Sequence, residues 1–232
     1  MRSWNLFHGN TLPPGRRAYL REMVELVTAD RPDVVCLQEV PAWALGRLGR
    51  WAGMTEVPAL ARRASAGPFP IPRIFGRALT APNHGLIRSA FAGQGNSVLL
   101  ARSLRVVASA TLPFAAPEPR VAQRVDTDQL AVANVHLSHP PRAEAELARV
   151  LEWLADATLL VVAGDFNMTP ELDGFSGLIP GWIDQVLARG AGEDARLVGR
   201  RTAVRRSAPV GPRAGRGRDR YRVSVIASGA AV

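Results

Sequence analysis

The sequence predicts an α/β fold over residues 1–195, and three observations support this prediction. Continuous apolar runs of strand length occur along the chain, and apolar residues recur at helical spacing between them. The chain has 232 residues, of which 47% are hydrophobic, so it can bury a sizeable core. No internal repeat is present. We therefore expect one domain over residues 1–195, followed by a separate basic tail over residues 196–232.

Five strands are predicted from apolar runs that end in polar residues. They cover residues 2–6, 33–40, 95–100, 131–137 and 158–163. The run at 33–40 is apolar at consecutive positions rather than at alternate ones, as expected of a strand that is covered on both faces.

Three helices are predicted over residues 17–29, 41–53 and 143–157 from the spacing of their apolar side chains. In the second, Trp43 and Trp51 share the apolar face and are interpreted as core residues. The third helix leads into the last predicted strand.

A carboxylate and an amide follow the last of these strands. Asp165 and Asn167 are two residues apart, so an extended backbone points both side chains to one face and Phe166 to the other. Gly164 permits the close approach of another backbone or of a ligand. An ordinary turn explains many such segments, but carboxylate and amide oxygens are also suited to metal and phosphate chemistry.

Four further polar residues lie at the ends of the other strands, namely Asn5, Glu39, Asn96 and His136. Each has an ordinary structural explanation, such as a solvated strand end for Glu39, a turn for Asn5 and a hydrogen-bonded core histidine for His136. Because the same arrangement recurs on strand after strand, the joint pattern favours one functional site.

Six segments, in order, resemble the motifs of the endonuclease/exonuclease/phosphatase superfamily, which includes deoxyribonuclease I-like nucleases. They are Ser3-Trp4-Asn5, Leu37-Gln38-Glu39, Gly95-Asn96-Ser97, Asn134-Val135-His136-Leu137, Gly164-Asp165-Phe166-Asn167 and Trp182-Ile183-Asp184-Gln185-Val186-Leu187. The resemblance implies a deoxyribonuclease I-like α/β fold, a four-layer sandwich of two packed mixed β-sheets flanked by helices. It also implies magnesium-dependent hydrolysis of a phosphoester.

The resemblance assigns metal and water chemistry to three residues. Glu39 would bind Mg²⁺ or Mn²⁺, with Asn5 beside it as a second oxygen ligand or as a hydrogen-bond partner of the phosphate. Asp165 would orient or deprotonate the attacking water. Magnesium keeps most of its waters and takes one or two carboxylates, so a sparse ligand set is expected.

The phosphate would be held by the remaining motif residues. Asn167 would donate to a non-bridging oxygen, and Asn96 and His136 would help to bind the phosphate. His136 would also stabilise the charge that develops in the transition state. The implied reaction is in-line attack of water on a phosphodiester or phosphomonoester, and the motifs do not separate these substrates.

The chain departs from the family after Asp184. In relatives, the aspartate at this position orients the histidine of a C-terminal Ser-Asp-His block, and no such block is present here. His8, His84 and His139 are the alternative partners for Asp184. Three function classes stay open: an active phosphoesterase, a non-catalytic relative that retains phosphate and metal binding, and a nucleic-acid-binding protein that acts through the basic tail.

The basic charge is concentrated in the tail. All 29 basic residues are arginine, and the formal net charge is +9. Residues 1–195 carry 19 arginines and 19 acidic residues, whereas residues 196–232 carry ten arginines and one aspartate. The tail is interpreted as an arm that binds nucleic acid, as a disordered end without a role, or as the product of a shifted reading frame.

The remaining expectations concern the loop, the cysteine and the location. Residues 58–95 are rich in proline, glycine and arginine, and we expect a loop that is either solvated or in contact with an anionic substrate. Cys36 is the only cysteine, which excludes an intrachain disulfide. No apolar run reaches 18 residues and no signal peptide is recognised, so we expect a cytoplasmic monomer without a membrane span.

Overall fold

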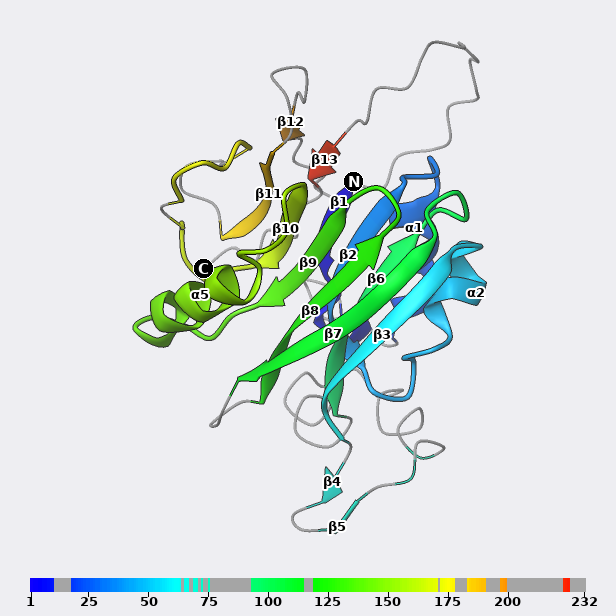
Figure 1. Cartoon of the computed structure of the whole chain (residues 1–232). Helices are drawn as coiled ribbons and strands as arrows, with labels where there is room; N and C mark the ends of the chain where they lie inside the picture. The colour runs from blue at the N-terminus through cyan, green and yellow to red at the C-terminus, as the bar shows by residue number, and fades with distance from the viewer. Residues whose placement is uncertain are drawn as a thin grey trace.

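Two β-sheets pack face to face, and helices cover their outer faces (Figure 1). The computed structural model describes residues 1–10, 18–63, 65–66, 69–70, 72, 75, 93–114, 119–170, 172–177, 183–190, 197–199 and 223–225. The four layers are a helical layer, a four-stranded sheet, a five-stranded sheet and a second helical layer. The expected sandwich of two mixed sheets is therefore confirmed.

The first sheet has the strand order β1-β2-β6-β3. Its strands are β1 (Arg2–Asn5), β2 (Val34–Pro41), β6 (Gln94–Leu100) and β3 (Thr55–Arg62). Strands β1 and β2 are parallel, and the other pairs are antiparallel. The 3-10 helix η1 (Phe7–Gly9) follows β1, and the helices α1 (Leu20–Thr28) and α2 (Leu48–Ala52) cover the outer face.

The second sheet has the strand order β11-β10-β9-β8-β7. Its strands are β11 (Asp184–Arg189), β10 (Leu160–Asp165), β9 (Ala131–His136), β8 (Arg120–Thr127) and β7 (Val106–Phe114). Only β9 and β10 run parallel, and they are joined through helix α5 (Arg142–Trp153), which packs on the outer face.

Two short strand pairs lie outside the main sheets. The antiparallel pair consists of β4 (Ser65–Ala66) and β5 (Phe69–Pro70), and the parallel pair of β12 (Leu197–Gly199) and β13 (Val223–Val225). Strand β13 lies beside β1 and β11.

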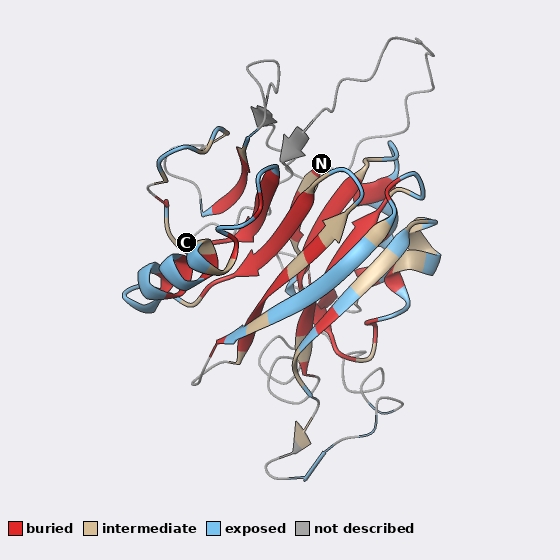
Figure 2. Cartoon of the chain, viewed as in Figure 1, coloured by how far each residue is buried: buried red, intermediate tan, exposed pale blue. Residues whose placement is uncertain are grey.

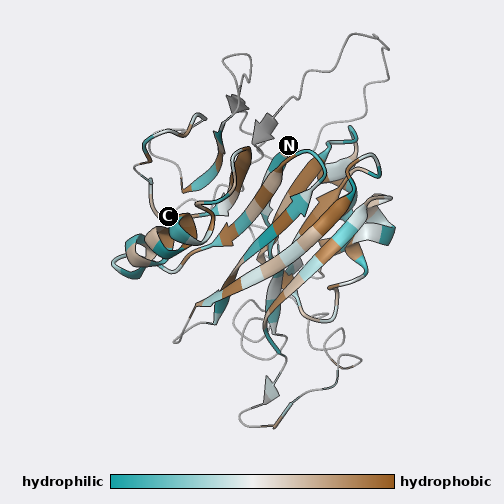
Figure 3. Cartoon of the chain, in the orientation of Figure 1, coloured by the Kyte–Doolittle hydropathy of each residue, from teal (hydrophilic) through white to brown (hydrophobic). Residues whose placement is uncertain are grey.

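Apolar side chains fill the space between the sheets at the end away from the polar strand ends. Cys36, Val98, Val132, Val161 and Val186 belong to this inner cluster. Two further clusters join the helices to the outer faces, which explains why the central strands are buried on both sides (Figures 2 and 3). Alternate side chains on these strands face the inner cluster. Polar residues that lie two or four positions further along the same strand therefore also face the space between the sheets.

The five predicted strands are confirmed, with bounds that differ by one or two residues. Strands β3, β7, β8 and β11 were not predicted as strands. The first residues of the expected loop at 58–95 belong to β3, because this edge strand pairs with β6 although it is only partly buried. Strand β7 is largely exposed, so it lacks the apolar run on which the prediction depended.

The helix predicted over residues 41–53 was too long. Strand β2 continues to Pro41, and residues 42–47 form turns in which Ala44 N–H donates to Pro41 O and Arg47 N–H donates to Ala44 O. Gly46 has a φ of 83°, a left-handed conformation that interrupts a helix at this point. The third predicted helix ends at Trp153, four residues early. The first is confirmed as α1, which begins at Leu20 and ends at Thr28, inside the predicted range.

Several sequence predictions concern residues outside the described ranges. His84, Trp182 and most of residues 196–232 lie there, so the three interpretations of the tail stay predictions. In the part of the chain that the structure describes, no helix is long and apolar enough to span a membrane.

Gly164 provides a test of close packing between β9 and β10. A Cβ atom at Gly164 would lie 1.9 Å from Val135 O, and its φ is 148°. We expect Gly164→Ala to lower the free energy of unfolding by several kcal/mol, because the backbones must separate to admit the methyl group.

Gly174→Ala is the matched control, since its φ is 75° but no atom lies within 4 Å of the added Cβ. Urea denaturation should show a loss at Gly174 of only about 1 kcal/mol. Equal losses would contradict the steric explanation.

Candidate functional site

Polar side chains from both sheets meet at one end of the space between them. This end contains the C-terminal ends of β1, β2, β9 and β10 and the N-terminal ends of β6, β8 and β11. The sequence-predicted residues that lie there are Asn5, Glu39, Asn96, His136, Asp165, Asn167 and Asp184. The expected gathering of separate segments is therefore present.

Asn5 lies at the centre, between two carboxylates. Its Nδ2 is 3.1 Å from Glu39 Oε1 and 3.0 Å from Asp165 Oδ2. Its Oδ1 accepts the backbone N–H of Phe7 at 3.0 Å. In this conformation the amide nitrogen rather than the oxygen faces the carboxylates, which agrees better with a hydrogen-bonding role for Asn5 than with direct metal ligation.

Glu39 reaches the site through a β-bulge. The pairing of β2 with β6 shifts register between Leu37 and Val40, and Glu39 has a φ of 51°. Without the bulge, Glu39 would face the outer helices, because Gln38 already points inward. The sequence placed Glu39 at a strand terminus, and this was wrong in detail: β2 continues to Pro41, and the bulge redirects the side chain.

His136 is buried beside both carboxylates. Its Nε2 is 3.8 Å from Glu39 Oε1 and 3.8 Å from Asp165 Oδ2. Burial, together with the positive charge of Arg120, lowers the pKa of His136 well below its ordinary value. The imidazole is therefore neutral at neutral pH in this arrangement and can donate one hydrogen bond.

Asp165 and Asn167 are held together by a local hydrogen bond. The backbone N–H of Asn167 donates to Asp165 Oδ1 at 2.9 Å, and Asn167 Nδ2 donates to Leu137 O at 2.8 Å. Strand β10 ends at Asp165 and Asn167 has a φ of 52°, so this hydrogen bond, and not strand alternation, fixes their relation. Phe166 is buried on the opposite side, in the apolar cluster that includes Leu147 and Val150 of α5, as predicted.

Burial raises the pKa of the Asp165 carboxyl. Hydrogen bonds from Asn5 and from the backbone of Asn167 oppose this effect, as does the positive charge of Arg120. A carboxylate with a raised pKa is a stronger base toward water, provided that it is ionised.

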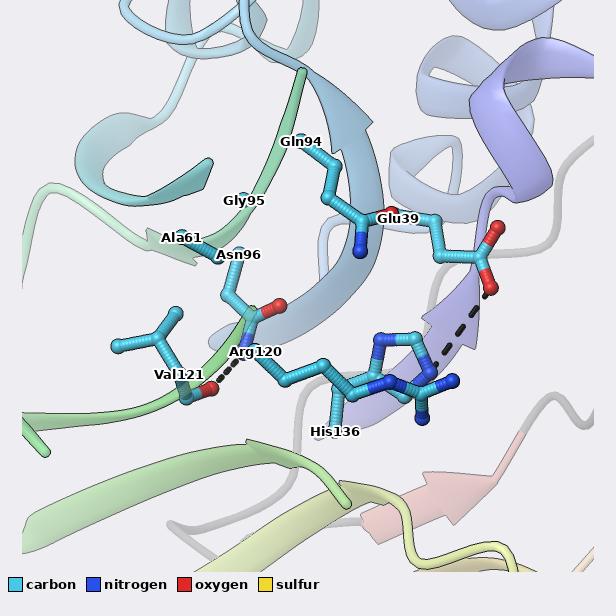
Figure 4. A pocket seen from close by; sticks show the side chains of 8 residues that line it. All are labelled: Glu39, Ala61, Gln94, Gly95, Asn96, Arg120, Val121 and His136. Atoms are coloured by element: carbon cyan, nitrogen blue, oxygen red, sulfur yellow. Dashed lines mark hydrogen bonds and ion pairs between the residues drawn. The ribbon is translucent and has the colours of Figure 1, made fainter. Parts of the chain in front are cut away.

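A cavity opens next to these residues (Figure 4). It is lined by Glu39, Ala61, Gln94, Gly95, Asn96, Arg120, Val121 and His136. Asn96 Nδ2 donates to Val121 O at 2.8 Å and to Asn134 O at 3.3 Å, so the amide nitrogen links the sheets. The role of Asn96 toward phosphate stays a prediction.

Arg120 is the cavity residue that the sequence analysis missed. Its Nη1 donates to Leu137 O, its exposed fraction is 7%, and its charge acts on both His136 and Asp165. The only signal in the sequence is its place at the start of the segment Arg120–Thr127, directly after Pro119. A guanidinium in such a cavity is well suited to bind a phosphate.

Buried amides connect the two sheets just below the site. Gln38 Nε2 donates to Asn134 Oδ1 at 2.7 Å and to Ser3 Oγ at 3.1 Å. Asn134 Nδ2 donates to Leu37 O at 3.0 Å and to Ser97 O at 3.2 Å. These contacts join β1, β2 and β6 of one sheet to β9 of the other.

Asp184 lies directly opposite Asp165 in the antiparallel pairing of β11 with β10. Its side chain is buried, and its Oδ1 has no hydrogen-bond partner among the described residues. Burial, with a smaller contribution from the Asp165 charge, raises the pKa of Asp184 to about 8. The imidazole partner expected from the family pattern is thus not seen at this atom.

The donor set is compatible with a hard divalent cation. The carboxylates of Glu39 and Asp165 both accept hydrogen bonds from Asn5 Nδ2, so they lie close together. Mg²⁺ is commonly held by one or two carboxylates and several waters. Within the described ranges, no three or more His, Cys, Asp and Glu side chains are arranged as a preformed metal site. The ligand set proposed below is therefore a sparse one.

Comparison with known proteins identifies the fold. A sequence model of the endonuclease/exonuclease/phosphatase family matches residues 3–209.

Solved structures of similar fold include a protein of the same description from Beutenbergia cavernae. It has a TM-score of 0.58 and 16% identity, covering 81% of this chain and 63% of that one. A conserved protein from Enterococcus faecalis of unknown function has a TM-score of 0.57 and 16% identity, covering 81% and 86%. Truncated TDP2 from Caenorhabditis elegans has a TM-score of 0.52 and 15% identity, covering 82% of each chain. No curated protein matches.

The raised pKa of Asp184 predicts how the free energy of unfolding of the metal-free protein depends on pH. Its raised pKa means that the folded state binds a proton which the unfolded state releases between pH 4 and about 8. The free energy of unfolding should therefore fall as the pH rises through this window, by at most a few kcal/mol, since one pKa unit corresponds to about 1.4 kcal/mol. Asp184→Asn should flatten this fall. Urea titrations at several pH values in EDTA test it, with the exposed Asp173→Asn as control. Parallel curves for wild type and Asp184→Asn would contradict the prediction.

Proposed function

Because the chain belongs to the endonuclease/exonuclease/phosphatase family, we propose that it is a phosphoesterase that depends on Mg²⁺ or Mn²⁺. In this proposal it hydrolyses a phosphodiester or phosphomonoester by in-line attack of water. The observation that carries the proposal is the position of Asn5, which hydrogen-bonds both Glu39 and Asp165 from opposite sheets. This contact brings the candidate metal-binding carboxylate and the candidate base to one point beside the cavity.

Asp165 would act on the attacking water. Its burial raises its pKa, which strengthens it as a base, and its hydrogen bonds from Asn5 and Asn167 keep the carboxylate in one orientation. General-base catalysis of this kind contributes about 10²-fold to 10⁴-fold to a rate.

The phosphate would bind on the side of the cavity that Arg120 and His136 line. Arg120 donates to Leu137 O, and its planar guanidinium matches the geometry of phosphate oxygens. His136 would donate from its neutral imidazole to the oxygen on which charge develops. Asn167 would donate with the second hydrogen of its amide nitrogen, since the first is bonded to Leu137 O.

Glu39 would hold the divalent ion, and its bulge directs the carboxylate to the site rather than to the outer helices. When bound, such an ion polarises a phosphoryl oxygen and offsets negative charge in the transition state. It would also reduce the repulsion between the carboxylates of Glu39 and Asp165, which both accept hydrogen bonds from Asn5 Nδ2.

A non-catalytic relative is the second candidate, and a specific observation favours it. The chain contains no histidine after His139 and no Ser-Asp-His block, although Asp184 is present and buried. In this alternative the chain would retain phosphate and metal binding without turnover.

The substrate class is proposed only as a phosphoester. One protein of similar fold is a mannosyl-6-phosphatase from Bacteroides thetaiotaomicron, with a TM-score of 0.52 and 12% identity. The arginine-rich tail supports nucleic acid as a substrate or partner instead, since arginine side chains neutralise backbone phosphates.

Hydrolysis should be measured with Mg²⁺ or Mn²⁺ on a generic phosphodiester, on plasmid DNA and on inositol phosphates. We expect Asp165→Asn to lower kcat by about 10²-fold or more, because the variant lacks the base. Asp173→Asn removes an exposed carboxylate that is not among the candidate site residues and should leave the rate unchanged.

Metal binding separates the two candidates. Mg²⁺ or Mn²⁺ should raise the melting temperature of the wild type but not of Glu39→Gln, because a ligand that binds only the folded state stabilises it. Stabilisation without hydrolysis of any substrate would favour the non-catalytic relative. Equal rates for wild type and Asp165→Asn would eliminate the proposed enzyme mechanism.

A further inference from the structure

A second histidine, His8, faces the candidate metal-binding carboxylate. It belongs to η1, which begins two residues after the end of β1, and its exposed fraction is 2%. Its Nε2 lies 3.7 Å from Glu39 Oε2. The other carboxylate oxygen, Oε1, is approached by His136 Nε2 at 3.8 Å. Glu39 therefore has one buried imidazole nitrogen near each of its two oxygens.

These distances are too long for hydrogen bonds, but they suit donor atoms that share an ion. Nitrogen and oxygen ligands lie about 2.0–2.2 Å from small divalent ions, so two ligands of one ion can be separated by up to about 4.4 Å. The separations at Glu39 fall within this limit. A hydrogen bond between the same groups would require about 2.7–3.2 Å.

The backbone at His8 is in an unfavourable conformation that places the side chain inside the site. Phe7 and His8 have φ values of 45° and 55°, a region that residues other than glycine rarely adopt. The segment is held there by backbone hydrogen bonds, from Leu6 N–H to Gln38 O and from Tyr19 N–H to Gly9 O. Such strained residues concentrate at functional sites, because their geometry is fixed by the surrounding structure.

We propose that His8 determines which divalent ion the site prefers, by presenting its imidazole to an ion bound at Glu39 and so favouring Mn²⁺ over Mg²⁺. Mn²⁺ shares the preference of Mg²⁺ for oxygen ligands, but as a transition-metal ion it binds imidazole nitrogen more strongly than Mg²⁺ does. This inference rests on the proposed function, because it requires that Glu39 holds the ion. The other candidate metal ligands are oxygen atoms, because His136 is assigned to the phosphate although its Nε2 lies at a similar distance from Glu39.

The preference for Mn²⁺ can be measured with the ions alone. The full chain is freed of metal with EDTA and titrated with MnCl₂ or MgCl₂ by calorimetry, as wild type and as His8→Asn. Asparagine tolerates left-handed backbone and keeps a polar group at the position. We expect His8→Asn to weaken Mn²⁺ binding by about tenfold or more and Mg²⁺ binding by less than about threefold.

Two controls make the result specific. His139→Asn removes an exposed imidazole near the site and should not change the ratio of the two affinities. Glu39→Gln should abolish binding of both ions. Equal weakening of both ions in His8→Asn, or no weakening, would overturn the inference and leave the proposed function in place. Unchanged binding in Glu39→Gln would place the ion elsewhere and overturn the proposed metal site as well.

A spectroscopic test does not depend on the stability of His8→Asn. Bound Mn²⁺ should show nitrogen hyperfine coupling in electron spin echo spectra of the wild type. The coupling should persist in His136→Asn, since His8 still supplies a nitrogen to the ion. Its absence from the wild type, or its loss in His136→Asn with Mn²⁺ still bound, would overturn the assignment of His8.

Discussion

Hydrogen bonds between buried amides hold the two sheets at the spacing that the candidate site requires. Gln38 reaches from β2 to Asn134 on β9, and Asn134 returns a hydrogen bond to Leu37 O. All three residues are completely buried, so a missing partner would cost about 1–3 kcal/mol for each group left unsatisfied. Gln38 directly precedes Glu39, and Asn134 lies two residues before His136. The contact that joins the sheets therefore also sets the distance between a candidate ligand and a candidate phosphate-binding group.

The site follows from the alternation of side chains along the strands. Strand β10 shows the pattern most clearly, since Val161 and Ala163 lie in the inner cluster and Asp165 is the next residue on that face. On β9, Val132 is followed by Asn134 and His136 on the inner face. Each strand thus changes from apolar to polar toward the same end. An apolar core and a polar site are two parts of one space between the sheets.

The sequence predicted what this alternation encodes and missed what depends on irregular backbone. The buried strands and the residues at their ends were identified because continuous apolar runs that end in polar residues are visible in the sequence. The bulge at Glu39 and the left-handed turn at His8 leave no such signal, since both depend on contacts with other strands. Arg120 was missed because an arginine at the start of a strand resembles a solvated residue in the sequence. Gly46, in contrast, was a visible helix breaker within the helix predicted over residues 41–53.

The site contains three residues with left-handed backbone, namely His8, Glu39 and Asn167. For each of them, the α or β backbone conformation would have a lower energy. Asp165 adds to this local instability, because it is buried close to a second carboxylate at Asp184. The inner and outer apolar clusters supply the stability that tolerates these features. If these side chains served only in packing, the fold would be more stable with an unstrained backbone and without the buried charges. Strain and buried charge are expected instead of a site whose groups are held in position before an anionic ligand and a cation bind.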